Sequence, residues 1–236
     1  TVTVVEVTKP NMAQKGVIKI SKSGEVFSSV TEADGIYQPV FAVKRLAGAV
    51  YEITVAEDII TPDGTLRASV GEVVDTVTTD ETGLTESKPL YLGKYEIREI
   101  TAPVGYVLNT EVHTAELVYA GQEVEITETA ADFYNERQKA AVSLNKVLEQ
   151  NTQFEIGMNG EISAVTFGLF AAEDLTAADG SIIPADGLLE ILSVDENGHA
   201  VCKTDLPFGS YYLKELSTDG HYILSDEKHP IIFDYA

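Results

Sequence analysis

The sequence is poor in the residues that cross-link or mark many secreted and catalytic proteins. Its 236 residues include one cysteine, Cys202, two methionines and no tryptophan. A single cysteine excludes an internal disulfide, so the domain, if secreted, would need another stabilising device. Cys202 lies in the apolar segment 200–202, which favours an inert, buried thiol. No signal peptide, membrane-spanning run or sorting motif is found, and the strand-like residues at the start predict an excised fragment.

Basic residues are also scarce, because 16 Lys and Arg stand against 38 Asp and Glu and give a net charge of −22. This field repels phosphate backbones and anionic headgroups, so we expect no nucleic-acid partner and no membrane insertion. The histidines show no metal-ligand spacing, and no nucleophile or phosphate-loop motif occurs. We therefore expect no cofactor, no metal and no enzyme acting on external substrates. The histidines are His113, His199, His221 and His229.

The chain does contain an internal repeat. Residues 56–64 recur at 172–180, and residues 92–100 recur at 208–216, both at an offset of 116. The first strand-like segments, 17–22 and 141–146, lie 124 residues apart. The first copy thus holds about eight additional residues, which we assign to a loop within 23–39. Repetition at this period predicts duplicated domains.

The elements of each copy are short strands separated by turns. Residues 17–20, 51–55, 95–99 and 124–127 alternate or are β-branched, and Pro, Asp, Asn and Gly mark the turns between them. This pattern predicts an all-β fold of two tandem antiparallel β-sandwiches.

The spacing of two asparagines sets the predicted domain boundaries. Asn11 precedes Lys22 by eleven residues, and Asn135 precedes Lys146 by eleven. Residues 1–11 are therefore interpreted as the last strand of a preceding repeat. The first domain is assigned to residues 12–138. The second is assigned to residues 139–236 and lacks its closing strand.

Three polar residues occur at positions where the strand alternation predicts core residues. Lys22 continues the face of two isoleucines, Glu99 follows two apolar residues of its face, and Asn135 follows Phe133. Lys146 and Glu215 repeat the first two positions. Each residue alone could point to solvent at a strand end, and a buried Lys–Glu ion pair would also account for two of them. Their recurrence at the same phase favours a chemical role.

That role follows from the chemistry of buried side chains. Burial lowers the pKa of a lysine, which is a nucleophile only when neutral, and a buried carboxyl group can transfer protons. Attack of the lysine on an asparagine carboxamide would release ammonia and leave a neutral amide between first and last strands. Such a link would replace the missing disulfide.

Two segments resemble motifs of the Cna B-type (SpaA-like, prealbumin-like) domains of Gram-positive surface adhesins and pilins. Residues 46–53 (LAGAVYEI) are similar to the phrase L-x-G-A-x-F, and residues 93–106 (GKYEIREITAPVGY) to G-x-Y-x-L-x-E-x-x-A-P-x-G-Y. The resemblance implies that Lys22 is the nucleophile, Asn135 the acceptor and Glu99 the proton shuttle of an isopeptide bond. It also implies matching roles for Lys146 and Glu215, although residues 217–222 depart from the motif.

The resemblance implies a structural stalk module, secreted to the cell surface or cell wall of a Gram-positive bacterium. Its partners would be the neighbouring repeats. The alternative is a ligand-binding adhesin domain that recognises host matrix or glycan, with 23–39 as its candidate surface. The incomplete second copy also suggests strand exchange between molecules, in which Asn11 of another molecule would meet Lys146.

Overall fold

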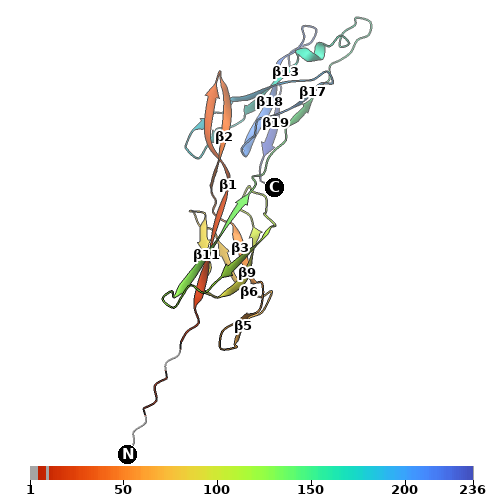
Figure 1. Ribbon diagram of the computed structural model, residues 1–236. Coiled ribbons are helices and arrows are strands. Elements are labelled where there is room, and N and C mark those ends of the chain that lie inside the picture. The colour runs from red at the N-terminus through yellow and green to blue at the C-terminus, as the bar shows by residue number, and fades with distance from the viewer. Residues whose placement is uncertain (1–4, 9–10, 236) are drawn as a thin grey trace, which may run out of the picture. The chain divides into compact units, whose positions relative to one another are not determined.

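The computed structural model describes residues 5–8 and 11–235, and these residues form mainly β-strands (Figure 1). The helical element among them is η1 (Glu161–Ala164), a single 3-10 turn. The described chain therefore holds no helix that is long and apolar enough to span a membrane. Two compact units are formed, the first from Thr1–Gly24 and Lys44–Glu136, the second from Glu25–Val43 and Arg137–Ala236. The predicted all-β class is confirmed.

The first unit is a β-sandwich. One sheet has the order β10-β9-β3-β6, and on the other side β1 pairs in parallel with β11 and antiparallel with β7 and β8. Figure 1 shows β3, β6, β9 and β11 gathered in this unit. Its strands are β1 (Lys15–Ala33, to Gly24 in this unit), β3 (Val50–Val55), β4 (Ile59–Ile60), β5 (Leu66–Ala68), β6 (Val73–Thr78), β7 (Leu84–Glu86), β8 (Leu90–Tyr91), β9 (Gly93–Thr101), β10 (Val112–Leu117) and β11 (Ile126–Asn135).

Strand alternation builds the core of this unit. In β3, the buried residues Tyr51, Ile53 and Val55 alternate with half-buried ones, and Tyr95 and Ile97 do the same in β9. Burying each such side chain contributes about 1.5–3 kcal/mol relative to leaving it exposed. The register is therefore fixed, because a slip of one residue would turn all of these side chains to the solvent.

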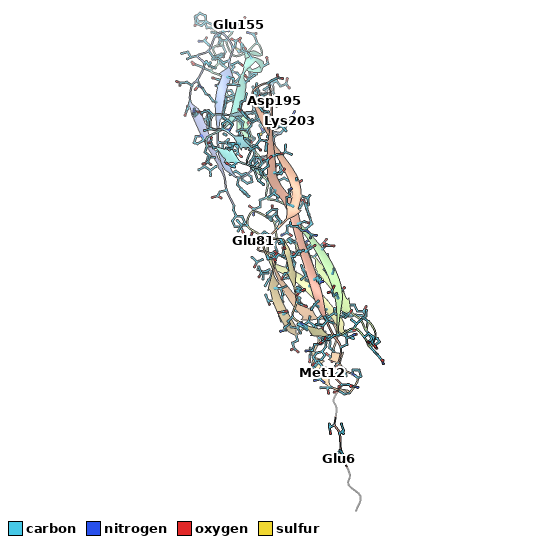
Figure 2. All side chains as sticks on the ribbon, turned by 90° about the vertical axis from the view of Figure 1, so that its left-hand side faces the viewer. Glu6, Met12, Glu81, Glu155, Asp195 and Lys203 are labelled. Carbon is cyan, nitrogen blue, oxygen red and sulfur yellow. The ribbon has the colours of Figure 1, made fainter. Side chains whose placement is uncertain are left out.

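The second unit repeats this arrangement. The sheet β16-β13-β18-β19 matches β6-β3-β9-β10, and β12 pairs with β17 as β1 pairs with β7. Figure 2 labels Asp195 and Lys203, which flank β17. The strands are β12 (Ser143–Asn145), β13 (Thr166–Ala171), β14 (Leu175–Thr176), β15 (Ile182–Ile183), β16 (Leu188–Ser193), β17 (His199–Val201), β18 (Gly209–Ser217) and β19 (Lys228–Phe233). No strand among the described residues corresponds to β11.

The segment predicted as a loop at 23–39 is instead a β-hairpin, so this prediction is wrong. β1 continues to Ala33, Asp34 and Gly35 form the turn, and β2 (Ile36–Arg45) returns. Both turn residues have positive φ, 53° and 77°. This geometry suits a two-residue hairpin turn, which Asp-Gly favours. The sequence signals for the hairpin were the Asp-Gly pair and the β-branched and aromatic residues around it.

The hairpin belongs to the second unit rather than to the first. Ile36 pairs with Leu188 of β16, and the carbonyl of Phe27 accepts a 3.0 Å hydrogen bond from the Ala178 amide. The Gln38 side chain donates a 2.9 Å hydrogen bond to the Leu189 carbonyl. Side chains of Phe27, Val30 and Tyr37 pack against the core of the second unit. The units therefore differ from the predicted domains 12–138 and 139–236 at residues 25–43, and also at Arg137 and Gln138, which belong to the second unit.

The segment interpreted as a preceding strand shows no strand at residues 5–8 and 11. The remaining positions of 1–11 lie outside the described residues. Val5 and Val7 are 79% and 85% exposed, and Met12, labelled with Glu6 in Figure 2, is 91% exposed.

Candidate cross-linking site

Lys22 is fully buried in the first unit, although its charged form would require solvation. It shares the inward face of β1 with Ile18 and Ile20, which are also buried. Its amide donates a 2.9 Å hydrogen bond to the Gly83 carbonyl, and its carbonyl accepts one of 3.0 Å from the Leu46 amide. The backbone therefore holds the lysine facing inward.

β9 and β11 bring the other two predicted residues to the same place. Asn135 ends β11 and is 1% exposed, whereas Glu99 lies near the end of β9 and is 5% exposed. β11 runs parallel to β1, with Phe133 opposite Lys22 and Asn135 opposite Gly24. The parallel pairing is decisive, because it places the last residue of β11 beside the lysine rather than at the far end of β1.

The three side chains form a closed triangle. Lys22 Nζ lies 2.9 Å from Glu99 Oε1 and donates a hydrogen bond to Asn135 Oδ1. Asn135 Nδ2 donates to both carboxylate oxygens of Glu99 at 3.0 Å. The Asn109 amide donates to Glu99 Oε2 at 2.8 Å. The amine is thus next to the carboxamide, and the carboxyl group contacts both the amine and the nitrogen that would leave.

Two aromatic rings enclose the lysine amine. Nζ lies 5.8 Å from the ring centroids of both Tyr51 and Phe133, which are 4.6 Å apart. The His113 ring packs on Phe133 with a centroid distance of 4.2 Å. Burial lowers the pKa of Lys22, although the hydrogen bond and the charge of Glu99 act in the opposite direction. Removal from water thus favours the neutral amine that nucleophilic attack requires.

Tyr51 carries a polar group that the surroundings do not satisfy. Its hydroxyl is buried and has no hydrogen-bond partner within the described chain. Burial, together with the nearby charge of Glu99, raises the pKa of Tyr51 above its ordinary value. The phenol therefore stays neutral beside the triangle.

The second unit holds the corresponding Lys–Glu pair, and no asparagine side chain among the described residues is hydrogen-bonded to it. Lys146 Nζ lies 2.9 Å from Glu215 Oε1, and the Ser225 amide donates to Glu215 Oε2 at 2.9 Å, as Asn109 does to Glu99. Lys146 Nζ lies 6.0 Å from the Phe167 ring centroid. The Lys146 side chain is 24% exposed, in contrast to 0% for Lys22.

Sequence reasoning missed the supporting groups of both sites. Tyr51 and Phe167 are 116 residues apart, so the repeat already paired them, but only the fold shows that each lies under a lysine. The amides of Asn109 and Ser225 have the same offset. A backbone donor leaves no trace in the sequence, and these two could not have been found there.

Comparison with known proteins agrees with the motifs. Residues 42–130 match the family model of the SpaA prealbumin-like fold domain. This part of the chain, most of the first unit, is similar to prealbumin-like domains of the SpaA type, which confirms the resemblance drawn from residues 46–53 and 93–106. The chain has no match among curated proteins.

A solved structure supports the fold. The Bacillus anthracis TIE protein matches with a TM-score of 0.57 and 22% identity over 94% of this chain. The chain spans 32% of the length of that structure. A streptococcal ancillary pilin (20% identity, 98% of this chain, 62% of that one, TM-score 0.34) and BcpA, the major pilin subunit of Bacillus cereus (15% identity, 93% and 69%, TM-score 0.35), also match.

Proposed function

We propose that this chain is a stalk segment of a bacterial surface protein or pilin, and that an amide bond between Lys22 and Asn135 locks its first unit. The observation that carries the proposal is the buried triangle in which Lys22 Nζ contacts both the Asn135 carboxamide and Glu99. A lysine and a glutamate buried only as an ion pair are weak evidence for stability. The Asn135 carboxamide, which is hydrogen-bonded to both side chains, supports a reaction instead.

The reaction needs no external reagent. Neutral Lys22 Nζ attacks Asn135 Cγ and forms a C–N bond. The attacking nitrogen then gives up a proton, and Glu99, which contacts both nitrogens, passes a proton to Asn135 Nδ2. The Cγ–Nδ2 bond breaks and ammonia leaves. The product is a neutral secondary amide, so the pair of buried charges disappears. The event is a single turnover within the chain and not enzymatic activity toward other molecules.

The position of this bond suits a protein that carries load. The chain leaves the first unit after Gly24 and again after Glu136, and the bond joins residues close to both points. Tension between the N-terminus and residue 137 would pass through the bond and bypass residues 23–134. A cross-link that closes a loop of about 100 residues stabilises the fold by roughly 4–5 kcal/mol in the chain-entropy model.

The second unit is proposed to be another domain of the same type. Its strands and its Lys–Glu pair correspond to those of the first unit at offsets close to 116. We also propose attachment at the surface or cell wall of a Gram-positive bacterium, with neighbouring repeats as partners, and the SpaA-type match supports this proposal. The alternative adhesin function relied on 23–39 as a free loop. The packing of Phe27, Val30 and Tyr37 in the second unit removes that support.

Intact mass of the denatured chain tests the proposal. We expect the parent to be lighter than its sequence mass by one ammonia, and a Glu99→Gln variant to keep the full mass. Fragmentation should then locate the link between Lys22 and Asn135. A parent of full mass would show that the triangle is only a hydrogen-bonded ion pair.

A further inference from the structure

Tyr51 differs from the other fully buried tyrosines in what its hydroxyl contacts. Tyr51, Tyr95 and Tyr211 are each 1% exposed or less. The Tyr95 hydroxyl donates a hydrogen bond to the Tyr91 carbonyl, and the Tyr211 hydroxyl donates one of 2.6 Å to the Pro207 carbonyl. The Tyr51 hydroxyl has no hydrogen-bond partner within the described part of the chain. Buried polar groups nearly always have a partner, so this exception requires an explanation.

The Tyr51 side chain borders the cross-linking triangle. Tyr51 pairs with Glu99 across β3 and β9. The Tyr51 ring centroid lies 5.8 Å from Lys22 Nζ and 4.6 Å from the ring centroid of Phe133. Phe133 precedes Asn135 by two residues on the buried face of β11. The phenol is therefore next to the place where all three members of the triangle meet.

The Glu99 carboxylate has no capacity left for this hydroxyl. Lys22 Nζ and Asn135 Nδ2 contact Oε1, whereas Asn135 Nδ2 and the Asn109 amide donate to Oε2. These contacts occupy the roughly four acceptor sites that a carboxylate offers. The Asn135 carboxamide oxygen is the other acceptor of the triangle.

The proposed attack changes the hydrogen bonding of this oxygen. In the structure, Asn135 Oδ1 accepts a hydrogen bond from Lys22 Nζ. When Nζ forms its bond to Cγ, the electron pair of the carbonyl π bond moves to Oδ1, and Nζ no longer donates to that oxygen. The tetrahedral adduct thus has an oxyanion that has lost its donor, beside a buried hydroxyl that has no acceptor.

The hydroxyl is not required for packing at this position. Phe167 corresponds to Tyr51 at the offset of 116, and its ring centroid lies 6.0 Å from Lys146 Nζ. The second unit therefore accommodates an aromatic ring without a hydroxyl beside its lysine. The additional polar group of the first unit must be explained by something other than the fold.

We propose that the Tyr51 hydroxyl donates a hydrogen bond to Asn135 Oδ1 in the tetrahedral adduct and so accelerates cross-linking. This inference rests on the proposed function, because the adduct forms only in that reaction. A donor that gains its acceptor only in the transition state increases the rate.

The phenol keeps its own proton throughout the reaction. Burial, together with the charge of Glu99, raises the pKa of Tyr51 and holds the hydroxyl in its donor form. The adduct collapses when the carbonyl bond re-forms and the Cγ–Nδ2 bond breaks. Ammonia then leaves with the proton that Glu99 passes to Nδ2.

The test follows the loss of ammonia during first folding of the full chain in cell-free synthesis. Samples are quenched in denaturant at successive times, their intact mass is measured, and fragmentation locates the link. We expect Tyr51→Phe to react about 100-fold more slowly than the parent, as on removal of one oxyanion donor. The ratio of the rates at pH 8.5 and pH 6 should stay unchanged, because the phenol transfers no proton. Tyr95→Phe, whose hydroxyl donates to a backbone carbonyl, should react at the parent rate.

Chemical denaturation of the fully cross-linked chains separates this role from a structural one. Tyr51→Phe should be more stable than the parent although it reacts more slowly, whereas Tyr95→Phe should be less stable and react at the parent rate. A structural role would move stability and rate in the same direction.

Three results would overturn the role of Tyr51 and leave the cross-link itself in place. They are a Tyr51→Phe rate within tenfold of the parent rate, an equal slowing in Tyr95→Phe, and a changed pH ratio, which would indicate proton transfer. A parent that keeps its full mass would instead overturn the Lys22–Asn135 bond, and the role of Tyr51 with it. The two failures are therefore distinguishable.

Discussion

The two units place corresponding lysine and glutamate side chains 2.9 Å apart, but among the described residues the lysine is fully buried in the first unit and partly exposed in the second. β11 supplies Phe133 and Asn135 in the first unit, and there Lys22 is fully buried and hydrogen-bonded to a carboxamide. In the second unit, where no strand among the described residues corresponds to β11, Lys146 is 24% exposed. The difference teaches that the pair alone does not make a reaction site. In the first unit β11 covers Lys22 and places the Asn135 carboxamide beside it, as the proposed reaction requires.

Removing the glutamate of the Lys–Glu pair should have the largest effect on stability, and the loss should be larger in the first unit than in the second. Glu99→Ala removes the partner of a fully buried lysine, which costs about 3–5 kcal/mol, and also prevents the cross-link, which costs roughly 4–5 kcal/mol more. Glu215→Ala is the matched control and should cost less, because water still reaches Lys146. Thermal unfolding of both variants measures the contrast. Equal losses of stability would contradict the difference between the units.

Weakening the packing of the hairpin should destabilise the second unit and leave the first unchanged. Phe27 belongs to the first repeat in sequence but packs on the core of the second unit, so Phe27→Ala should destabilise the second unit by about 2 kcal/mol. Hydrogen exchange should become faster in β16 and β18 and stay unchanged in β9. Val43→Ala, at a residue that is 59% exposed, serves as the control. Faster exchange in β9 instead would show that the hairpin stabilises the first unit and would contradict its assignment to the second.

Cross-link formation should accelerate with rising pH. The neutral amine attacks, and burial lowers the pKa of Lys22 from its ordinary 10.5, so the neutral fraction rises at lower pH than for an exposed lysine. The unfolded chain holds this proton to higher pH, so the stability contributed by this group rises with pH between the folded and the unfolded pKa and is lost as pH falls through the folded pKa. Loss of ammonia can be followed during first folding in cell-free synthesis at pH 6 and pH 8.5. A faster reaction at pH 6 would contradict the neutral-amine mechanism.

Removing the hydroxyl of Tyr51, the aromatic residue beside Lys22, should have the smallest effect on stability. Tyr51→Phe removes a buried hydroxyl that has no partner within the described chain and copies Phe167 of the second unit. We expect a gain of about 1 kcal/mol in the free energy of unfolding. Tyr95→Phe, which loses the hydrogen bond to the Tyr91 carbonyl, should instead lose about 1 kcal/mol. Chemical denaturation of both variants checks the opposite signs.

The sequence allowed much of this site to be predicted. Alternation placed Lys22, Glu99 and Asn135 on inward faces, and the structure buries all three to 5% exposure or less. The repeat predicted the second pair, Lys146 and Glu215. The amide bond itself stays a prediction. The loop at 23–39 was misinterpreted because its length was read as an insertion, and its strand-like residues and Asp-Gly turn were given too little weight.

Local pattern and repetition in the sequence thus determined the all-β class, the duplicated arrangement of strands and the identity of the buried polar residues. Those properties depend on neighbours two residues apart or on a fixed offset, which the sequence displays directly. Only the tertiary structure decided that β11 lies parallel to β1 and that the hairpin of residues 25–43 completes the second unit. Such pairings join segments far apart in the chain, and the free energy of packing selects among partners that have similar local patterns.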